Sequence, residues 1–163
     1  MGAAVEVVVE VPRGGFAKRD ERGRVDFWSP LPCPYNYGRV PGSVAPDGAP
    51  LDVVLLGPRR PRGARVTAEL LGIIDFVDGG LLDPKLVAAP ADARVAPAWS
   101  GLDRFFRVYA ALKRCLAAAR GRRGETMFRG WTRHPVSRGR EGRAATVNSR
   151  HDEVSSRYDE DGR

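Results

Sequence analysis

Hydrophobic residues in the first 130 positions fall into short runs, and each run stops near a Gly, a Pro or an Asp-Gly pair. Runs rich in Val, Ile and Leu predict strands at residues 5–11, 25–28, 51–56, 65–77 and 85–89. Turn signals between them recur roughly every ten residues. This spacing favours a small closed or partly closed β-barrel over a fold of alternating strands and helices.

Several stretches within this pattern carry expectations of their own. Residues 35–38 and 40–42 are predicted to form turns, because Asn, Gly and Pro are frequent there. Residues 65–77 are predicted to form two short strands that meet at Gly72. The charged segment 18–24 has the composition of a solvated hairpin tip, but Lys18 follows the first predicted strand closely enough to belong to a site instead.

One amphipathic helix is expected after the predicted strands. Its apolar face has three-and-four spacing and consists of Leu102, Phe105, Phe106, Tyr109, Leu112 and Leu116. Ser100 or Asp103 is expected to cap its start, and Gly121 to end it. Residues 125–131 are expected to be a last strand or a stretch packed on the barrel.

The composition changes after Trp131. Residues 133–163 consist mostly of Arg, Asp, Glu, Ser and Gly, with only isolated apolar residues. Such a segment buries too little apolar surface to offset the entropy lost when it becomes ordered. We therefore expect one globular domain at residues 1–132 and a disordered charged tail at residues 133–163.

Size and cysteine content narrow the class of protein. A chain of 163 residues suits a single domain. It has no apolar run near the roughly 20 residues that cross a bilayer, so we expect no membrane span. A basic leader is also absent, and we expect no secretory signal. The two cysteines, Cys33 and Cys115, are expected to be buried free thiols in a reducing cytoplasm.

Two acidic pairs share one spacing. Asp47 and Asp52 stand five residues apart, as do Asp78 and Asp83, and Lys85 follows the second pair. Acid pairs beside a lysine, at the rims of short strands, indicate a site for divalent cations and a phosphate. Hydrolysis of a phosphoanhydride needs carboxylates for Mg²⁺, cations for the phosphate oxygens and hydroxyls that donate to them. The chain supplies these groups as Asp47, Asp52, Asp78, Asp83, Glu10, Lys18, Lys85, Tyr37 and Tyr109.

The net charge of +7 is compatible with a different class, an OB-fold module that binds nucleic acid. Phe27 and Trp28, near Arg24, would form part of such a surface. Clustered aspartates would repel a phosphate backbone, however, unless metal covered them. We therefore expect no nucleic-acid partner beyond weak binding through the charged tail.

Residues 5–131 resemble the soluble family I inorganic pyrophosphatases. The motifs that carry the resemblance stand in the family's order: EVVVEVP at 6–12, PYNYG at 34–38, VPG at 40–42, DGAPLDVVLLG at 47–57, GIIDFVDGGLLDPKLVAAP at 72–90, FFRVYAALK at 105–113 and RGW at 129–131. The resemblance implies a mainly β fold with α, an OB-like five-stranded β-barrel with one long C-terminal helix packed on it. It also implies hydrolysis of pyrophosphate to two orthophosphates by a cytoplasmic homo-oligomer. The cofactor would be two or more Mg²⁺ ions, which Mn²⁺ could replace.

The same resemblance assigns roles to individual residues. Four aspartates resemble the family's metal ligands: Asp47, Asp52, Asp78 and Asp83. Four residues resemble its groups that hold the phosphates: Lys18, Lys85, Tyr37 and Tyr109. Glu10 resembles the glutamate that orients metal-bound water, and Asp52 resembles the aspartate shared by two ions. We therefore expect Asp52, Glu10 and Tyr37 to act in catalysis.

Three features depart from the family pattern. Ala49 stands where the family has the aspartate that accepts a proton from the attacking water, and removal of such a base typically costs about a hundredfold to ten-thousandfold in rate. Ala110 stands where a lysine commonly follows the helix tyrosine. The second strand lacks the family's arginine, for which Arg24 and Arg39 are candidates. Because metal ions themselves lower the pKa of water, we expect slow or specialised turnover. A catalytically inactive relative that binds metal and phosphate is the alternative.

Overall fold

The computed structural model of this protein describes residues 4–19, 23–46, 48–93, 95 and 98–133. These residues form strands and one long helix. The last described strand, β9 (Met127–Arg133), extends one residue past the predicted domain boundary after residue 132. The rest of the predicted tail, residues 134–163, lies outside the described residues.

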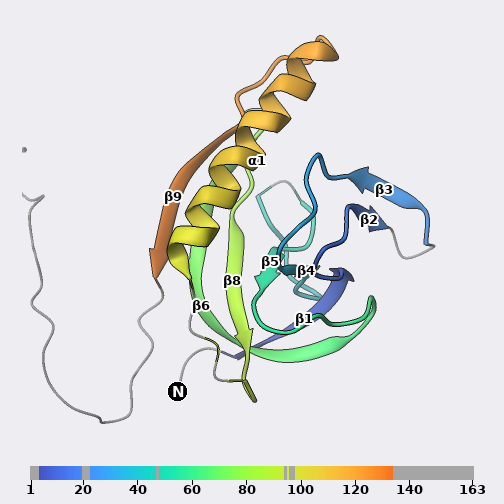
Figure 1. The fold of residues 1–163 in the computed structure, drawn as a ribbon, viewed down its shortest axis with the longest axis vertical. Coiled ribbons are helices and arrows are strands. Elements are labelled where there is room, and N and C mark those ends of the chain that lie inside the picture. The colour runs from blue at the N-terminus through green and yellow to red at the C-terminus, as the bar shows by residue number, and fades with distance from the viewer. Residues whose placement is uncertain (1–3, 20–22, 47, 94, 96–97, 134–163) are drawn as a thin grey trace, which may run out of the picture.

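Five strands close into a β-barrel (Figure 1). They are β1 (Ala4–Val11), β4 (Asn36–Arg39), β5 (Asp52–Leu55), β8 (Lys85–Pro90) and β6 (Arg65–Asp78). Neighbours run antiparallel, except that β5 and β8 are parallel, and β6 pairs with β1 to close the circle. The expected fold class, a five-stranded barrel with one C-terminal helix, is confirmed.

The strand β6 is unbroken, whereas the sequence predicts two strands that meet at Gly72. Its pairing with β8 shifts register between Leu70 and Gly72, so a bulge bends the strand without ending it. A Cβ at Gly72 would lie 2.5 Å from the carbonyl oxygen of Thr132 on β9. Glycine is therefore used here to admit a neighbouring backbone, and not to end a strand.

The strand β4 replaces the turn predicted at residues 35–38. The Asn36 side chain is fully buried, and its Oδ1 accepts backbone N–H groups from two segments 23 and 24 residues away. A Cβ at Gly38 would lie 2.2 Å from the carbonyl oxygen of Val8. Gly38 thus allows the close packing of β4 on β1, and Asn36 ties β4 to the segments at Arg13 and Arg60.

The helix α1 (Trp99–Ala119) packs against the barrel, and β9 runs beside it (Figure 1). Leu102 and Phe106 are buried on its inner face at the spacing that the sequence predicts, and Ala110 is buried beside them. The sequence predicts Leu116 on the same face, but it is 39% exposed near the end of the helix. The prediction of a side-chain N-cap is wrong, because the first turn has no side-chain cap. Gly121 adopts a φ of 63° just beyond the helix, which confirms its predicted role in ending it.

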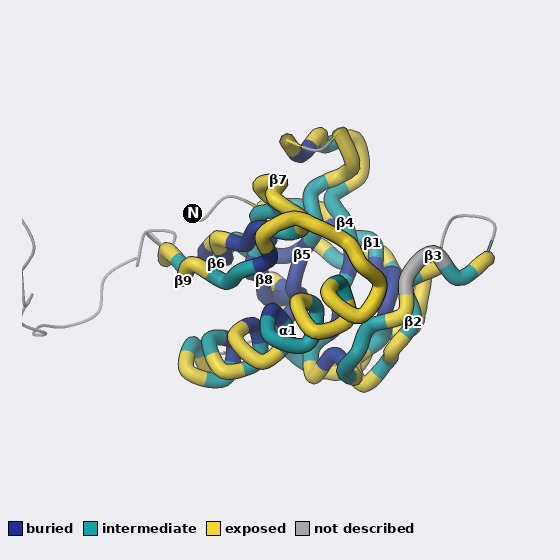
Figure 2. Tube along the Cα trace, turned by 90° about the horizontal axis from the view of Figure 1, so that it is seen from above, coloured by how far each residue is buried: buried dark blue, intermediate teal, exposed yellow. Residues whose placement is uncertain are grey.

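Buried side chains form two clusters. In Figure 2 the buried positions of the backbone lie toward the middle of the molecule, and exposed positions surround them. One cluster consists of Val7, Val9, Val53, Leu55, Ala68 and Ala88. The other joins the barrel to α1 and consists of Val54, Leu56, Ile74, Phe76, Val87, Ala89, Leu102, Phe106 and Ala110. Side chains of β5 alternate between the two clusters, as expected for a strand buried on both faces.

Four short or peripheral strands complete the described fold. The hairpin of β2 (Ala17–Arg19) and β3 (Val25–Trp28) lies beside the barrel. Of the segment expected at the tip, Lys18 and Arg19 lie on β2 instead, and residues 20–22 lie outside the described residues. β7 (Leu81–Leu82) and β9 both pair with β6. No helix in the described part of the chain combines the length and the apolar character that crossing a membrane requires.

Candidate active site

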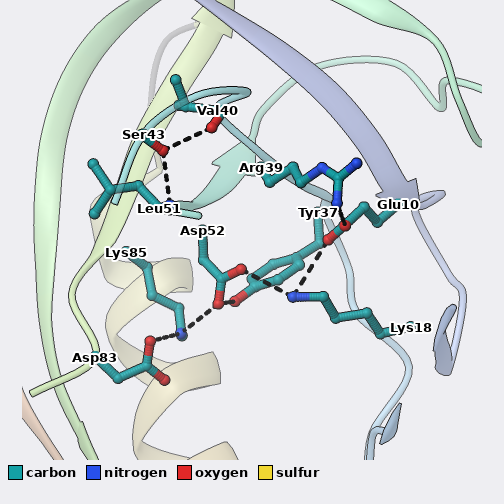
Figure 3. Close-up of polar contacts among 10 residues, drawn as sticks. All are labelled: Glu10, Lys18, Tyr37, Arg39, Val40, Ser43, Leu51, Asp52, Asp83 and Lys85. Carbon is teal, nitrogen blue, oxygen red and sulfur yellow. Dashed lines mark hydrogen bonds and ion pairs between the residues drawn. The ribbon is translucent and has the colours of Figure 1, made fainter. Parts of the chain in front are cut away.

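The first residues of two parallel strands form the centre of the site. Asp52 begins β5 and Lys85 begins β8, and the strand register places them side by side. Tyr37 lies on the neighbouring strand β4, opposite Val54. Val54 lies two residues after Asp52 on β5, so the two point to the same face of the sheet. Their partners Tyr37 and Lys85 point there as well. A carboxylate, an ammonium group and a phenol therefore meet at one mouth of the barrel (Figure 3).

Asp52 is the meeting point of this group (Figure 3). Its Oδ1 lies 3.1 Å from Lys18 Nζ, and its Oδ2 lies 3.0 Å from Lys85 Nζ. The Tyr37 hydroxyl donates to Oδ2 at 2.6 Å. Burial raises the pKa of Asp52, but the two ammonium groups and the hydroxyl outweigh it and hold that pKa below its ordinary value. Asp52 is therefore ionised at neutral pH.

The two lysines differ in burial. Lys85 is only 4% exposed, and its Nζ bridges Asp52 and Asp83, the latter at 2.7 Å. Lys18 comes from β2, and its Nζ also lies 3.3 Å from Glu10 Oε2. Burial lowers the pKa of Lys18, but Asp52 and Glu10 raise it above its ordinary value. The two carboxylates around Lys18 therefore keep its ammonium group protonated at neutral pH.

The second acidic pair lies around the β6–β7 hairpin. Asp78 ends β6 and Asp83 follows β7, so the hairpin brings both residues to the same mouth. Burial raises the pKa of Asp83, and the charges of Asp52 and Asp78 add to this, against the lowering effect of Lys85. A further cation nearby would stabilise the ionised form of such a carboxyl group. Carboxyl groups with a raised pKa are frequent in ligand and metal sites.

Asp78 is held by groups from outside the barrel. Lys113 of α1 forms an ion pair with Asp78 Oδ2, and Thr126 Oγ1 donates to Asp78 Oδ1 at 3.2 Å. The Lys113 ammonium lies 5.6 Å from the centre of the Tyr109 ring, about one helical turn earlier. The helix therefore contributes both a cation and a hydroxyl to the site.

Tyr37 and Tyr109 keep their hydroxyl protons at neutral pH. Burial raises the pKa of both hydroxyls, and the negative charges of Asp52 and Asp78, respectively, raise it further. Both side chains can therefore donate a hydrogen bond to an anion. Tyr109 packs against three phenylalanines, Phe76, Phe105 and Phe106.

Glu10 stands at a bulge of β1, where the pairing with β4 shifts register. It is buried between two cations, because its Oε2 faces Lys18 and its Oε1 lies 3.5 Å from Arg39 Nη1. Of the two candidates for the missing arginine, Arg24 is exposed and Arg39 pairs with Glu10. Neither lines the central cavity.

The groups around Asp52 enclose one cavity of about 220 Å³. Its charged and phenolic lining consists of Lys18, Tyr37, Asp52, Asp78, Asp83, Lys85, Tyr109 and Lys113. The structure thus brings the predicted site residues together, apart from Glu10 and Asp47. Glu10 reaches the group through Lys18. Asp47 lies outside the described residues, and its role stays a prediction.

The loop that precedes β5 is anchored by Ser43 (Figure 3). Its hydroxyl donates to the Val40 carbonyl oxygen at 2.6 Å and accepts the Leu51 N–H at 2.9 Å. Ala49, in the same loop, is exposed and does not line the cavity. The Ala49 side chain therefore forms no part of the cavity wall.

The carboxylates fit a hard divalent cation. Carboxylate oxygens suit Mg²⁺ and Mn²⁺, and Mg²⁺ commonly takes only one or two carboxylates together with phosphate oxygens. Asp52, Asp78 and Asp83 present such groups to one cavity, where lysines balance them. Within the described ranges, no group of three or more His, Cys, Asp or Glu residues could hold an ion by itself.

Two site residues were missed by the sequence analysis, Lys113 and Thr126. Lys113 lies four residues after Tyr109, and this spacing places both on one helix face, so the signal was present in the sequence. Thr126 offered no such signal, because its contact with Asp78 joins positions 48 residues apart.

The two cysteines are both free, but they differ in exposure. Cys33 is buried in the wall of the cavity, as expected. The expectation of burial is wrong for Cys115, which is exposed on α1. Burial raises the pKa of the Cys33 thiol from 9.0 to about 11.

We expect one thiol of the folded protein to react quickly with dithionitrobenzoate at about pH 8, because the thiolate is the reactive form and Cys33 is almost wholly protonated there. The second thiol should react only after unfolding in guanidinium. Release of the coloured product, followed before and after denaturant is added, measures both. Cys115→Ser should remove the fast reaction, and two fast thiols in the folded protein would contradict the burial of Cys33.

The fold is an OB-like β-barrel. Aspartates, lysines and tyrosines form a polar site at one of its mouths. Residues 7–121 match the family model of inorganic pyrophosphatase. Because the match covers well over half of the chain, the protein belongs to the inorganic pyrophosphatase family.

Individual relatives agree with this family. The inorganic pyrophosphatase of Halalkalibacterium halodurans is 36% identical over 97 residues, 54% of this chain and 59% of that protein. That of Sulfolobus acidocaldarius is 35% identical over 106 residues, 60% of this chain and 61% of that protein. The chain thus matches less than two thirds of the length of either relative. A solved inorganic pyrophosphatase from Coxiella burnetii superposes with a TM-score of 0.65 at 27% identity, covering 80% of this chain and 86% of the other.

Proposed function

We propose that the protein hydrolyses inorganic pyrophosphate to two orthophosphates with the help of Mg²⁺. The observation that carries this proposal is the shared cavity, in which Asp52, Asp78 and Asp83 face Lys18 and Lys85. Membership of the inorganic pyrophosphatase family supports it. A small cavity with both carboxylates and ammonium groups suits a compact polyanion that arrives together with cations.

The lysines and tyrosines bind the two phosphates. Lys18 and Lys85 neutralise phosphate oxygens as point charges, and Tyr37 and Tyr109 donate hydrogen bonds from hydroxyls that burial keeps protonated. Lys85 is fixed between Asp52 and Asp83 before the substrate arrives. Such preorganised charge stabilises the negative charge that develops on the leaving phosphate.

Asp52, Asp78 and Asp83 hold the metal in this proposal, with Asp47 as a fourth predicted ligand. When bound, Mg²⁺ neutralises phosphate charge and lowers the pKa of the attacking water. Asp52 offers a carboxylate that needs no deprotonation, since its pKa is lowered by its neighbours despite burial. Mn²⁺ accepts the same oxygen ligands and is expected to substitute.

Glu10 orients the attacking water. Its Oε2 is buried and ion-paired with Lys18 Nζ at 3.3 Å, and it keeps the capacity to accept a further hydrogen bond. A buried carboxylate oxygen in this state favours a donor such as water. Because Ala49 supplies no base, we expect turnover to be slow.

Release of orthophosphate from magnesium pyrophosphate by the purified protein tests the proposal. We expect release that EDTA abolishes and added Mg²⁺ restores. If no phosphate is released above the level of Asp52→Asn, the enzymatic claim is removed. The alternative is then a relative that binds metal and phosphate without turnover, and calorimetry with imidodiphosphate, an analogue that is not hydrolysed, measures that binding.

Ala49→Asp is expected to raise the rate by up to about a hundredfold, because it places a proton acceptor where the family has one. Steady-state kcat at saturating Mg²⁺ and pyrophosphate measures the change. The matched control is Ala49→Asn, which has the same shape but accepts no proton, and it should leave kcat unchanged. A fall in kcat for Ala49→Asp would mean that the site uses a different base.

We further propose a homo-oligomer in the cytoplasm. Two free thiols, one of them exposed, suit a reducing compartment. Light scattering coupled to size-exclusion chromatography measures the mass of the particle, and a single-chain mass at working concentration would remove the oligomer.

A further inference from the structure

We propose that Lys113 is a phosphate-binding residue of the cavity, and that Asp78 holds its ammonium group in place until the phosphate binds. This inference rests on the proposed function, because it takes pyrophosphate or orthophosphate as the ligand. Lys113 lines the cavity together with Lys85 and Tyr109. It enters from α1, whereas Lys18 and Lys85 enter from strands, so it offers a cation from a different wall.

The position of Lys113 suits a phosphate ligand. Its side chain is 18% exposed, and its ammonium pairs with Asp78 Oδ2 while it lies 5.6 Å from the centre of the Tyr109 ring. Tyr109 keeps its hydroxyl proton because burial raises its pKa. Tyr109 and Lys113, four residues apart on one helix face, thus present a hydroxyl donor and an ammonium donor to the same cavity.

Position 110 cannot supply this charge in the present fold. Ala110 is 1% exposed and belongs to the cluster that joins α1 to the barrel, so a lysine there would displace core contacts or bury its charge. Position 113 follows Tyr109 by about one helical turn and reaches the cavity without entering the core. The helix therefore provides its cation one turn further along than the family's usual position.

The ion pair with Asp78 has a consequence for metal binding. Lys113 and a divalent cation would compete for the same carboxylate, that of Asp78. Lys113 should therefore weaken the binding of a cation that arrives alone. The same ammonium, once it turns to a phosphate oxygen, strengthens the binding of a phosphate that arrives with its cations. Loss of Lys113 should change these two affinities in opposite directions.

Isothermal titration calorimetry of Lys113→Gln with two probes tests this. We expect the affinity for Mn²⁺ alone to rise, and the affinity for imidodiphosphate in the presence of Mn²⁺ to fall about 10- to 100-fold, the range for a hydrogen bond to a charged group. Lys113→Arg keeps the charge and should retain most of the affinity for imidodiphosphate. The matched control is Arg107→Gln, which removes an exposed, ion-paired cation from the same helix and should change neither affinity.

An unchanged affinity of Lys113→Gln for imidodiphosphate would overturn the inference, and so would a parallel loss of both affinities, which marks a purely structural role. If Lys113→Gln does not fold, Asp78→Asn combined with Lys113→Gln removes both charges together. It should bind imidodiphosphate more weakly than Asp78→Asn alone, and equal binding would overturn the inference. Failure of the unmodified protein to bind imidodiphosphate would instead remove the proposed function, and this inference with it.

Discussion

Asp52→Asn is expected to lower the rate of pyrophosphate hydrolysis on the order of a thousandfold. Asp52 accepts contacts from Lys18, Lys85 and Tyr37, so it orders three of the groups that face the cavity. An asparagine keeps the shape but replaces one acceptor oxygen by an amide donor, which would face an ammonium group or a hydroxyl proton. It also removes the ionised carboxylate expected to bind metal. Phosphate release at saturating Mg²⁺ and pyrophosphate measures kcat.

The matched control for this variant is Asp103→Asn. Asp103 also pairs with a cation, Arg107, but on the outside of α1 and away from the cavity. Its loss should leave kcat unchanged and cost no more than about 0.5 kcal/mol in stability. If Asp52→Asn hydrolyses pyrophosphate as fast as Asp103→Asn, Asp52 is not part of the reaction.

Lys85→Met is expected to lower the free energy of unfolding by about 3–5 kcal/mol at neutral pH. Lys85 is buried between Asp52 and Asp83, and methionine fills a similar volume without the charge. The two carboxylates would then face each other across a buried site with one compensating cation fewer. Urea unfolding followed by circular dichroism measures the loss, and kcat should fall on the order of a hundredfold as well.

The stability deficit of Lys85→Met should depend on pH. Burial already raises the pKa of Asp83, and loss of the ammonium group, which lowers it, raises it further. A group whose pKa is higher in the folded state stabilises the fold below its unfolded pKa, and that stabilisation is lost as the pH rises through the folded pKa. The loss in the free energy of unfolding caused by Lys85→Met should therefore be smallest at about pH 4 and grow toward neutral pH.

The control for Lys85→Met is Arg65→Met, which removes the cation of an exposed ion pair with Glu6. Solvent screens such a pair, so its loss should cost less than about 1 kcal/mol. Equal losses for Lys85→Met and Arg65→Met would mean that the buried pair at the mouth of the barrel contributes no more than a surface pair.

Sequence patterns located most of the barrel strands and the helix because those elements bury one or both faces in a regular period. Runs such as Val53 to Leu56, and the helix face with Leu102 and Phe106, are stabilised in water when their apolar side chains are buried. The acidic pairs could be found for a related reason. Asp52 and Asp78 stand at strand ends, and the register that aligns the cores of β5 and β8 also aligns Asp52 with Lys85.

Backbone packing was not visible in the sequence. Gly38 and Gly72 look like turn or break signals, yet both sit where another strand comes too close for a side chain. Contacts between distant segments were equally hidden. The pairing of Glu10 with Arg39 depends on how β1 packs on β4, and that of Lys113 with Asp78 on how α1 lies against the barrel.

Anomalous diffraction from crystals soaked with Mn²⁺ and imidodiphosphate locates the manganese ions directly. It therefore tests whether aspartates that are far apart in the sequence bind metal at one site. We expect manganese peaks inside the cavity, at ligand distance from Asp52 and from Asp78 or Asp83, with a phosphate group on Lys85. Manganese bound only to other carboxylates, with none near Asp52, would contradict this account of the protein.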